Sequence, residues 1–196
     1  MSIDTQQTEV GQIPKDWSVV SVSEIGKITT GPFGTLLKAS EYSGQEGVPL
    51  ISVGEIGEGH FRISDHTPRV PRIVVRRLPQ YVLREGDIVF GRKGAVERSA
   101  LVTESEEGWF LGSDGISIRP NERCYPPYLA AQFQSNVVKT WLMKNAVGTT
   151  MASLNQGILG SALIPCATKE EQRAIAGALS DVDGLLGVLD LSLIHI

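Results

Sequence analysis

A heptad repeat of apolar residues near the C-terminal end is the feature that most constrains how this chain can fold. The apolar positions step alternately by four and three residues: Ile175, Leu179, Val182, Leu186, Leu189, Leu193 and Ile196. This spacing predicts an amphipathic helix with one apolar seam, which is typical of coiled coils. Thr168 and Glu171 stand just before the repeat at the spacing of a capping box, in which each residue satisfies a backbone N–H group. We therefore expect one helix over residues 168–196.

Such a helix needs a surface that covers its seam. A helix of roughly 28 residues extends about 42 Å, which is longer than a small domain needs. Gly177, Gly184 and Gly187 lie off the seam, and each glycine costs a helix up to about 1 kcal/mol. The helix is therefore expected to depend on a partner. That partner is either a second helix, as in a dimer, or the surface of the chain's own domain, and both interpretations stay open.

The chain from residue 17 to residue 120 is a series of short β-branched runs separated by glycine turns. Runs of this kind predict short strands and few helices. In residues 126–146 apolar side chains recur at four-residue spacing behind two prolines, which predicts an amphipathic helix. Residues 161–165 read as one more strand. The sequence therefore predicts an α+β fold, with a mainly β region that precedes the helices.

The charge of the chain is unevenly distributed. Formal net charge is −4, which by itself argues against a nucleic-acid partner. However, residues 69–98 hold eight Lys or Arg residues and three Asp or Glu residues, a net charge of +5, and the remainder of the chain carries −9. A basic segment inside an acidic protein fits local contact with phosphate groups. The alternative is a solvated charged face, and charge alone does not separate the two.

Several classes of protein are excluded by what the sequence lacks. No run of 18 apolar residues is present, so no membrane-spanning helix is expected. The polar N-terminus has no apolar signal region, which predicts a cytoplasmic protein. Cys124 and Cys166 are widely separated and fit reduced thiols. The three histidines have no cysteine or carboxylate grouping at metal-ligand spacing, so no metal site is predicted.

The sequence also lacks the motifs that hold nucleotides or perform catalysis. Gly31-Pro-Phe-Gly34 followed by Lys38 has neither the spacing of a P-loop nor that of a dinucleotide fingerprint, so no cofactor is expected. Tyr125-Pro-Pro-Tyr128 resembles the base-pocket motif of adenine methyltransferases, but its first position is tyrosine and no glycine-rich cofactor loop accompanies it. We interpret Pro126 and Pro127 as residues that begin a helix. The chain is therefore predicted to be non-catalytic, with a small adenine methyltransferase as the alternative.

The order of the motifs carries a resemblance to a known family. Gly-x-Ile-Pro-x-x-Trp at 11–17, the Gly-Pro-Phe-Gly loop and VPLISVGEIGEG at 48–59 come first. Later motifs are Gly86-Asp-Ile-Val-Phe90, Gly148-Thr-Thr150, Leu154-Asn155 and Glu171-Gln-Arg-Ala-Ile175. Together these resemble the target-recognition half of the specificity subunit of type I restriction–modification systems, over residues 11–190. The resemblance implies sequence-specific binding of double-stranded DNA and a spacer helix that carries modification (methyltransferase) and restriction subunits.

From the resemblance we expect a twisted, barrel-like recognition domain over residues 1–167 and a coiled-coil spacer or dimerisation helix over residues 168–196. Family members usually hold two such halves in about twice this length, whereas this chain shows one half and no internal repeat. Its last residues, 191–196, also differ from the usual charged spacer, which fits a truncated product. Two copies are expected to pair through the helix as a homodimer that reads a bipartite, palindromic site. A protein-interaction domain that uses only its helix is the second alternative.

Specific residues follow from this interpretation. The turn at Gly31–Gly34 is expected to set Lys38 beside a DNA backbone, although Phe33 also fits a core position. The residues expected to contact DNA are Lys38, Arg62, Arg92, Lys93, Arg98, Thr149, Thr150 and Asn155. Those expected to shape the loops are Gly31, Pro32, Phe33, Gly34 and Gly148. Those expected to form the dimer helix are Ile175, Leu179, Val182, Leu186 and Leu189.

Overall fold

The computed structural model describes residues 4–42, 46–148 and 150–193, with residues 186–193 described as helix backbone only. The described strands are β1 (Thr5–Thr8), β2 (Gly11–Pro14), β3 (Ser18–Ser21), β4 (Gly26–Thr30), β5 (Val48–Ile51), β6 (Arg69–Val70), β7 (Ile88–Gly91), β8 (Ser99–Leu101), β9 (Phe110–Leu111), β10 (Gly115–Pro120) and β11 (Leu163–Cys166). The α-helices are α1 (Val22–Ile25), α2 (Arg72–Arg77), α3 (Pro126–Gln134), α4 (Asn136–Asn145), α5 (Gln156–Ser161) and α6 (Lys169–Leu193). Short 3₁₀ turns are η1 (Ala39–Glu41), η2 (Val53–Glu55), η3 (Pro79–Tyr81) and η4 (Glu104–Glu106). This mixture of helix and strand confirms the predicted α+β class.

The central sheet is antiparallel, with strand order β4-β10-β7-β8. Alternate side chains of its strands, among them Ile28, Ile118 and Phe90, point to one face and join the main hydrophobic core. Helix α3 covers this face, where Phe133 meets the Phe90 ring edge-on with centroids 4.7 Å apart. The period of two in these short runs therefore sets which side of the sheet is buried.

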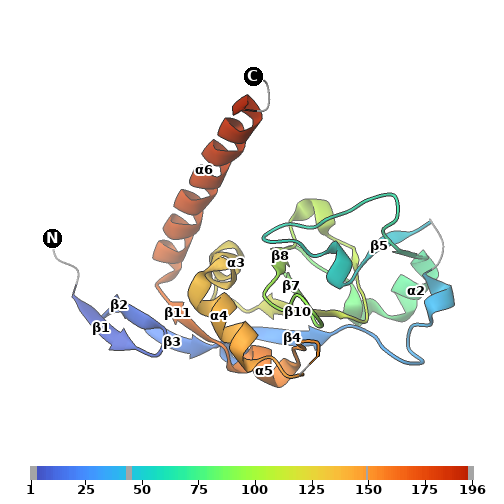
Figure 1. Ribbon diagram of the computed structural model, residues 1–196, viewed down its shortest axis with the longest axis horizontal. Helices are drawn as coiled ribbons and strands as arrows, with labels where there is room; N and C mark the ends of the chain where they lie inside the picture. The colour runs from blue at the N-terminus through green and yellow to red at the C-terminus, as the bar shows by residue number, and fades with distance from the viewer. Residues whose placement is uncertain (1–3, 43–45, 149, 194–196) are drawn as a thin grey trace.

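The opposite face of the same sheet is divided. Over β7 and β8 it is apolar, because Val89 and Ala100 pack into a second core with Ile51, Leu83 and Leu111. Over β4 and β10 the residues on this face are polar: Lys27, Thr29, Ser117 and Arg119. A third cluster around Phe110 joins β5, β6 and α2 at the end of the molecule away from β1 and β2 (Figure 1).

The predicted barrel-like sheet is wrong. The described strands form four separate sheets of two to four strands, in the orders β1-β2, β4-β10-β7-β8, β11-β3 and β6-β5-β9. Most of these strands have four residues or fewer, and 3₁₀ turns and irregular segments separate them. Strands this short pair only with immediate neighbours, so no hydrogen-bonded ring closes among the described residues.

The helix predicted over residues 126–146 is divided, and α5 forms where no helix was predicted. Residues 126–146 form two helices, α3 and α4, because Ser135 takes an extended conformation between them and its hydroxyl accepts the Val138 N–H at 3.4 Å as an N-cap. The prediction that Pro126 and Pro127 begin a helix is confirmed, since both occupy the first turn of α3. Among the described residues no helix is both long and apolar enough to cross a membrane.

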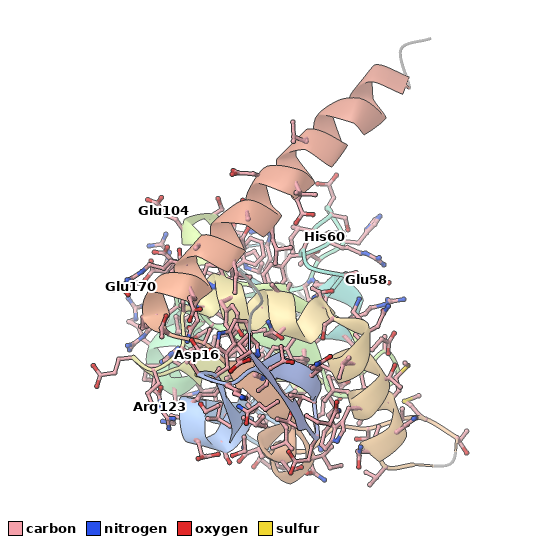
Figure 2. All side chains as sticks on the ribbon, turned by 90° about the vertical axis from the view of Figure 1, so that its left-hand side faces the viewer. Asp16, Glu58, His60, Glu104, Arg123 and Glu170 are labelled. Carbon is pink, nitrogen blue, oxygen red and sulfur yellow. The ribbon has the colours of Figure 1, made fainter. Side chains whose placement is uncertain are left out.

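The final helix projects away from the other elements (Figure 1). The capping box is confirmed: the Thr168 N–H and hydroxyl both donate to Glu171 Oε2, at 3.0 and 2.8 Å, and Thr168 Oγ1 accepts the Glu171 N–H at 3.3 Å. Ile175 packs against the main core, whereas Leu179 and Val182 are exposed. The side chains of Leu186, Leu189 and Leu193 lie outside what the structure describes, as does Ile196. Figure 2 shows Glu170 at the base of this helix.

Candidate nucleic-acid interface

Three turns come together at one end of the central sheet. Strands β4 and β7 end there and β10 begins there, because β10 runs antiparallel to both neighbours. The turns are residues 31–34, 92–94 and 112–114. The Gly31 N–H donates to the Gly115 carbonyl at 3.0 Å, and the Arg92 N–H donates to the Asp114 carbonyl at 2.8 Å. The strand topology therefore joins segments that are far apart in the sequence.

A fourth segment, residues 147–155, is fastened to the same place. The Leu154 N–H donates to the Arg92 carbonyl and the Gly94 N–H donates to the Ala152 carbonyl, both at 2.8 Å. Lys93 also forms an isolated β-bridge with Ser153. We call residues 31–34, 92–94, 112–114 and 147–155 the loop cluster. Backbone hydrogen bonds tie all four segments to one end of the central sheet, so the side chains of their described residues are brought together there.

Glycine is required at two positions in the loop cluster. A Cβ at Gly31 would stand 1.8 Å from the Gly112 carbonyl oxygen, so no other residue permits this approach of the two turns. Gly148 has a φ of +115°, and a Cβ there would stand 2.2 Å from the Met151 carbonyl oxygen. The predicted role of these two glycines in shaping the loops is consistent with this geometry.

The tip of the Gly31–Gly34 turn presents an exposed aromatic ring. Phe33 is 62% exposed, so the alternative that places it in the core is wrong. The Arg92 guanidinium carbon lies 5.7 Å from the centroid of the Phe33 ring, within cation–π distance. Among the described residues no carboxylate pairs with Arg92, whereas Lys93 Nζ lies 3.3 Å from Asp114 Oδ1 in a half-exposed ion pair. Such pairs contribute only about 0–1 kcal/mol, so Lys93 remains available to a stronger anionic partner.

A family model described as the type I restriction modification DNA specificity domain matches residues 14–188. The chain belongs to this family. It is 27% identical over 188 residues to the type I restriction enzyme MjaVIII specificity subunit of Methanocaldococcus jannaschii, covering 93% of the chain and 43% of that protein. It is 26% identical over 187 residues to the StySPI specificity subunit of Salmonella potsdam, covering 92% of the chain and 38% of that protein. The specificity domain thus spans less than half the length of these relatives.

Solved structures share the fold of this specificity domain. One, from a study of complex assembly and conformational transition of the type I R-M system, has a TM-score of 0.68 and 21% identity, over 92% of the chain and 41% of that structure. The HsdS subunit from Thermoanaerobacter tengcongensis has a TM-score of 0.68 and 19% identity, over 92% of the chain and 40% of that structure. At this level of identity the likeness concerns the fold.

The loop cluster contains some of the residues predicted to contact DNA and not others. Arg92, Lys93 and the exposed Thr150 belong to it, as does Asn155, whose Oδ1 also caps α5 by accepting the Ile158 N–H at 2.9 Å. Thr149 lies outside the described residues. Asp114, the ion-pair partner of Lys93, was missed, although its position in a Ser-Asp-Gly turn beside a strand was a usable signal.

The other predicted contacts lie elsewhere on the specificity domain. Lys38 is the N-cap residue of η1, and its N–H donates to Glu41 Oε2 at 2.8 Å. Arg62 and Arg98 flank a second junction, at which the loop of residues 57–62 meets β8 through the Gly59 N–H and the Ser99 carbonyl, 2.8 Å apart. Arg98 Nε is buried there without a hydrogen-bond partner among the described residues. Within the basic segment 69–98, Arg76 and Arg77 lie on α2, Arg84 follows η3, and Arg92 and Lys93 lie in the loop cluster. The segment is therefore spread over several places and is not one patch.

The geometry of Tyr128 argues against the methyltransferase interpretation. Its side chain is fully buried in the main core, and its hydroxyl donates to the Pro165 carbonyl at 2.7 Å. Burial raises the pKa of this hydroxyl. A methyltransferase motif would instead present its aromatic ring to a flipped base. In this specificity domain the residues that follow Tyr125 begin α3 and fasten it to β11.

Proposed function

We propose that this specificity domain recognises a double-stranded DNA target as the DNA-reading half of a type I restriction–modification specificity subunit. The observation that supports the proposal best is the loop cluster. Hydrogen-bonded glycine turns hold an exposed phenylalanine there, beside an arginine that has no carboxylate partner among the described residues. In this proposal residues 1–167 form the recognition domain and residues 168–196 form a spacer or dimerisation helix.

The loop cluster offers both kinds of contact that sequence-specific binding needs. Arg92 and Lys93 supply cations that neutralise phosphates and set the register of the domain on the duplex. Phe33 supplies an apolar ring that can pack against bases or enter between two of them, and Thr150 and Asn155 supply polar groups for base edges. Lys38, Arg62, Arg98 and Thr149 are proposed as flanking contacts.

We propose that the domain is not an enzyme and directs modification and restriction subunits to a bipartite site in cytoplasmic DNA. No cofactor is required for this role. Among the described residues no group of three His, Cys, Asp or Glu side chains can hold a metal ion. The chain alone is expected neither to methylate nor to cut DNA, and calorimetric titration with S-adenosylmethionine is expected to give no heat of binding. Micromolar affinity for that compound would favour the methyltransferase alternative.

We propose that α6 pairs with the same helix of a second chain, antiparallel about a two-fold axis. Leu179 and Val182 are 46% and 51% exposed, and Leu185 beside them is 67% exposed. The heptad repeat of the sequence predicts that Leu186 and Leu189 continue the apolar seam of Leu179 and Val182. Light scattering should report a dimer, and Leu179→Lys with Leu186→Lys should give a monomer that still folds. A wild-type chain that is monomeric at tens of micromolar would contradict the proposed dimer, but it would not affect the proposal that the domain binds DNA.

The DNA proposal is tested by selecting duplexes from a random-sequence pool and measuring affinity for the selected duplex. Arg92→Ala with Lys93→Ala should weaken duplex binding by about tenfold or more at low salt. The slope of log affinity against log salt concentration should become shallower by about 0.9 for each phosphate contact that is lost. The matched control is Arg76→Ala with Lys144→Ala, which removes two exposed cations that lie outside the loop cluster. Equal losses of duplex affinity in both variants would mean that Arg92 and Lys93 contribute only nonspecific positive charge. Absence of any duplex affinity would favour the interaction-domain alternative.

A further inference from the structure

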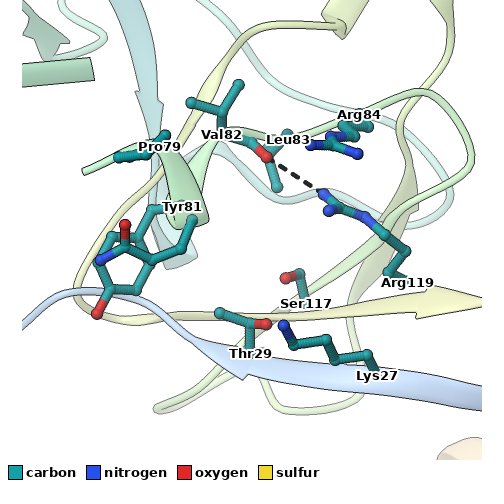
Figure 3. A pocket seen from close by; sticks show the side chains of 10 residues that line it. Lys27, Thr29, Pro79, Tyr81, Val82, Leu83, Arg84, Ser117 and Arg119 are labelled. Carbon is teal, nitrogen blue, oxygen red and sulfur yellow. Dashed lines mark hydrogen bonds between the residues drawn. The ribbon is translucent and has the colours of Figure 1, made fainter. Parts of the chain in front are cut away.

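A cavity of about 300 Å³ lies on the polar half of the central sheet, on the face opposite α3. Its floor is formed by β4 and β10, and its wall by η3 and the residues that follow it (Figure 3). Four side chains rise from the floor as two directly opposed cross-strand pairs, Lys27 with Arg119 and Thr29 with Ser117. Arg84 is added from the wall. The cavity therefore gathers three cations, and the hydroxyl groups of Thr29 and Ser117 lie on its floor.

The charge arrangement in this cavity is unfavourable without a ligand. Like charges that face each other across two strands destabilise a sheet, and Lys27 faces Arg119. Arg119 is neutralised by Asp87, which it contacts through two hydrogen bonds of 2.7 Å. The side chains of Lys27 and Arg84 form no hydrogen bond or ion pair among the described residues. Two uncompensated positive charges therefore remain.

Ser117 gives a second and independent indication of a ligand. It is only 7% exposed, and its hydroxyl forms no hydrogen bond among the described residues. Figure 3 shows this side chain pointing into the cavity between Thr29 and Arg119. The hydroxyl itself is accessible from the cavity, because Arg98 Nε is the one fully buried side-chain N or O atom without a partner among the described residues. The Ser117 hydroxyl is therefore free to donate to an acceptor that enters the cavity.

We propose that this cavity binds a phosphate group through Lys27, Arg84 and the Ser117 hydroxyl. Arg119 contributes from its position beside Asp87, and its guanidinium also donates to the Val82 carbonyl at 3.3 Å, which holds it at the cavity wall. Cations and hydroxyl donors that converge on one concave site match the three acceptor oxygens of a phosphate. The rest of the lining is Pro79, Gln80, Tyr81, Val82 and Leu83.

Two sources of this phosphate are compatible with the position of the cavity. Lys27 lies on β4, four residues before Gly31 in the turn that follows this strand, a distance of about 13 Å at the rise of a β-strand. A duplex held by the loop cluster would bring a backbone phosphate this far along its axis after about four base pairs, at about 3.4 Å per step. A free phosphate compound is the other source. Only the first of these rests on the proposed DNA-binding function.

The proposal is tested by calorimetric titration of the whole chain with inorganic phosphate and with pyrophosphate, using nitrate at equal ionic strength as the reference anion. Lys27→Gln with Arg84→Gln should weaken phosphate binding by about tenfold or more, and Ser117→Ala should weaken it less. Arg76→Gln with Lys144→Gln is the matched control, since it removes the same charge from two exposed cations outside the cavity. Phosphate binding no stronger than nitrate binding, or equal losses in both double variants, would overturn the proposal.

Duplex binding then separates the two sources. If the phosphate belongs to DNA, Lys27→Gln with Arg84→Gln should make the slope of log duplex affinity against log salt concentration shallower by about 0.9. If it belongs to a free compound, the variant leaves duplex binding unchanged and loses only pyrophosphate binding. If the wild-type chain binds phosphate in the cavity but binds no duplex, the proposed DNA-binding function is contradicted and the phosphate site is still supported.

Discussion

The two halves of α6 differ sharply although one heptad repeat runs through both. In the inner half, residues 169–176, Gln172 is fully buried: its Oε1 accepts the Tyr125 N–H at 2.7 Å, and its Nε2 donates to the Ala167 carbonyl at 2.9 Å and the Arg123 carbonyl at 3.2 Å. In the outer half, residues 177–185, Leu179, Val182 and Leu185 are between 46% and 67% exposed. The inner half is held to the domain by these hydrogen bonds and by Ile175 and Ala176 in the main core, whereas the outer half presents an uncovered apolar surface.

This difference shows where the helix obtains its stability. The inner half is fixed by hydrogen bonds from the chain segments that precede α3 and follow β11. The outer half depends on helix propensity, because a Cβ added at Gly177 or Gly184 would meet no atom of another element within 4 Å. A groove lined by Gly59, Ala131, Leu179 and Asp183 separates this half from the loop of residues 57–62 and from α3. In Figure 2 the helix extends well beyond the labelled Glu58 and His60.

The largest effect is expected at Gln172. Gln172→Ala leaves the Tyr125 N–H and the Ala167 and Arg123 carbonyls without this partner. The Ala167 contact is buried, and its loss costs about 1–3 kcal/mol, whereas the other two contacts are part-buried and water can replace the lost partner at a smaller cost. We expect the free energy of unfolding to fall by about 2–4 kcal/mol, measured by urea denaturation. The control is Ser180→Ala in the exposed outer half, with a change within about 0.5 kcal/mol. Similar losses in the two variants would remove the distinction between the halves.

A smaller effect is expected from the capping box at the start of the inner half. Thr168→Ala removes an N-cap hydroxyl and should lower the free energy of unfolding by about 1 kcal/mol, whereas Thr168→Ser should retain most of it. The Thr168 hydroxyl and N–H, followed by the Trp17 indole, hold the pKa of Glu171 below its usual range. A lowered folded pKa stabilises the protein above the unfolded value of about 4.3, and this contribution disappears as pH falls through the folded pKa.

The difference between wild type and Thr168→Ala should therefore be larger at neutral pH than at an acid pH below the folded pKa of Glu171, where the carboxylate is protonated. Denaturation of both proteins at the two pH values measures this. A difference that does not depend on pH would mean that the Glu171 carboxylate takes no part in the cap.

The smallest effect is expected in the outer half. Gly177→Ala and Gly184→Ala place a methyl group where no other part of the domain lies within 4 Å, and each should stabilise the local helix by about 0.8–1 kcal/mol. Amide hydrogen exchange over residues 177–185 should slow, while the global unfolding midpoint stays the same. Ala178→Gly is the reverse control and should speed that exchange. Faster exchange in the alanine variants would show that the glycines face a close neighbour.

Individual segments show how far sequence reasoning reaches. The Thr168–Glu171 cap and the prolines of α3 were predicted correctly, because both depend on residues within one helical turn. The single helix predicted over 126–146 was wrong, because the four-residue spacing continues through Ser135 although the backbone does not. The barrel-like sheet was wrong for a related reason: short β-branched runs identify strands but not their partners.

The candidate site shows the same limit. Arg92 and Lys93 were identified by charge and Gly148 by its motif, but the position of Phe33 was left open between the core and the surface. The cavity around Ser117 was missed, although the alternation of isoleucine with polar residues in β4 and β10 was a usable signal. Both were decided by contacts between segments that are far apart in the sequence.

Patterns within the sequence were enough to establish the α+β class, the positions of the glycine turns, the capped start of the final helix and the resemblance to the specificity family. These depend on short-range periodicity and on the order of motifs along the chain. Three further features emerged only when the chain was folded: four distant loops meet at one end of the central sheet, Phe33 faces solvent beside Arg92, and Lys27, Arg84 and Ser117 share a cavity. Strand pairing and burial are set by partners elsewhere in the chain, and local periodicity carries no record of which partners those are.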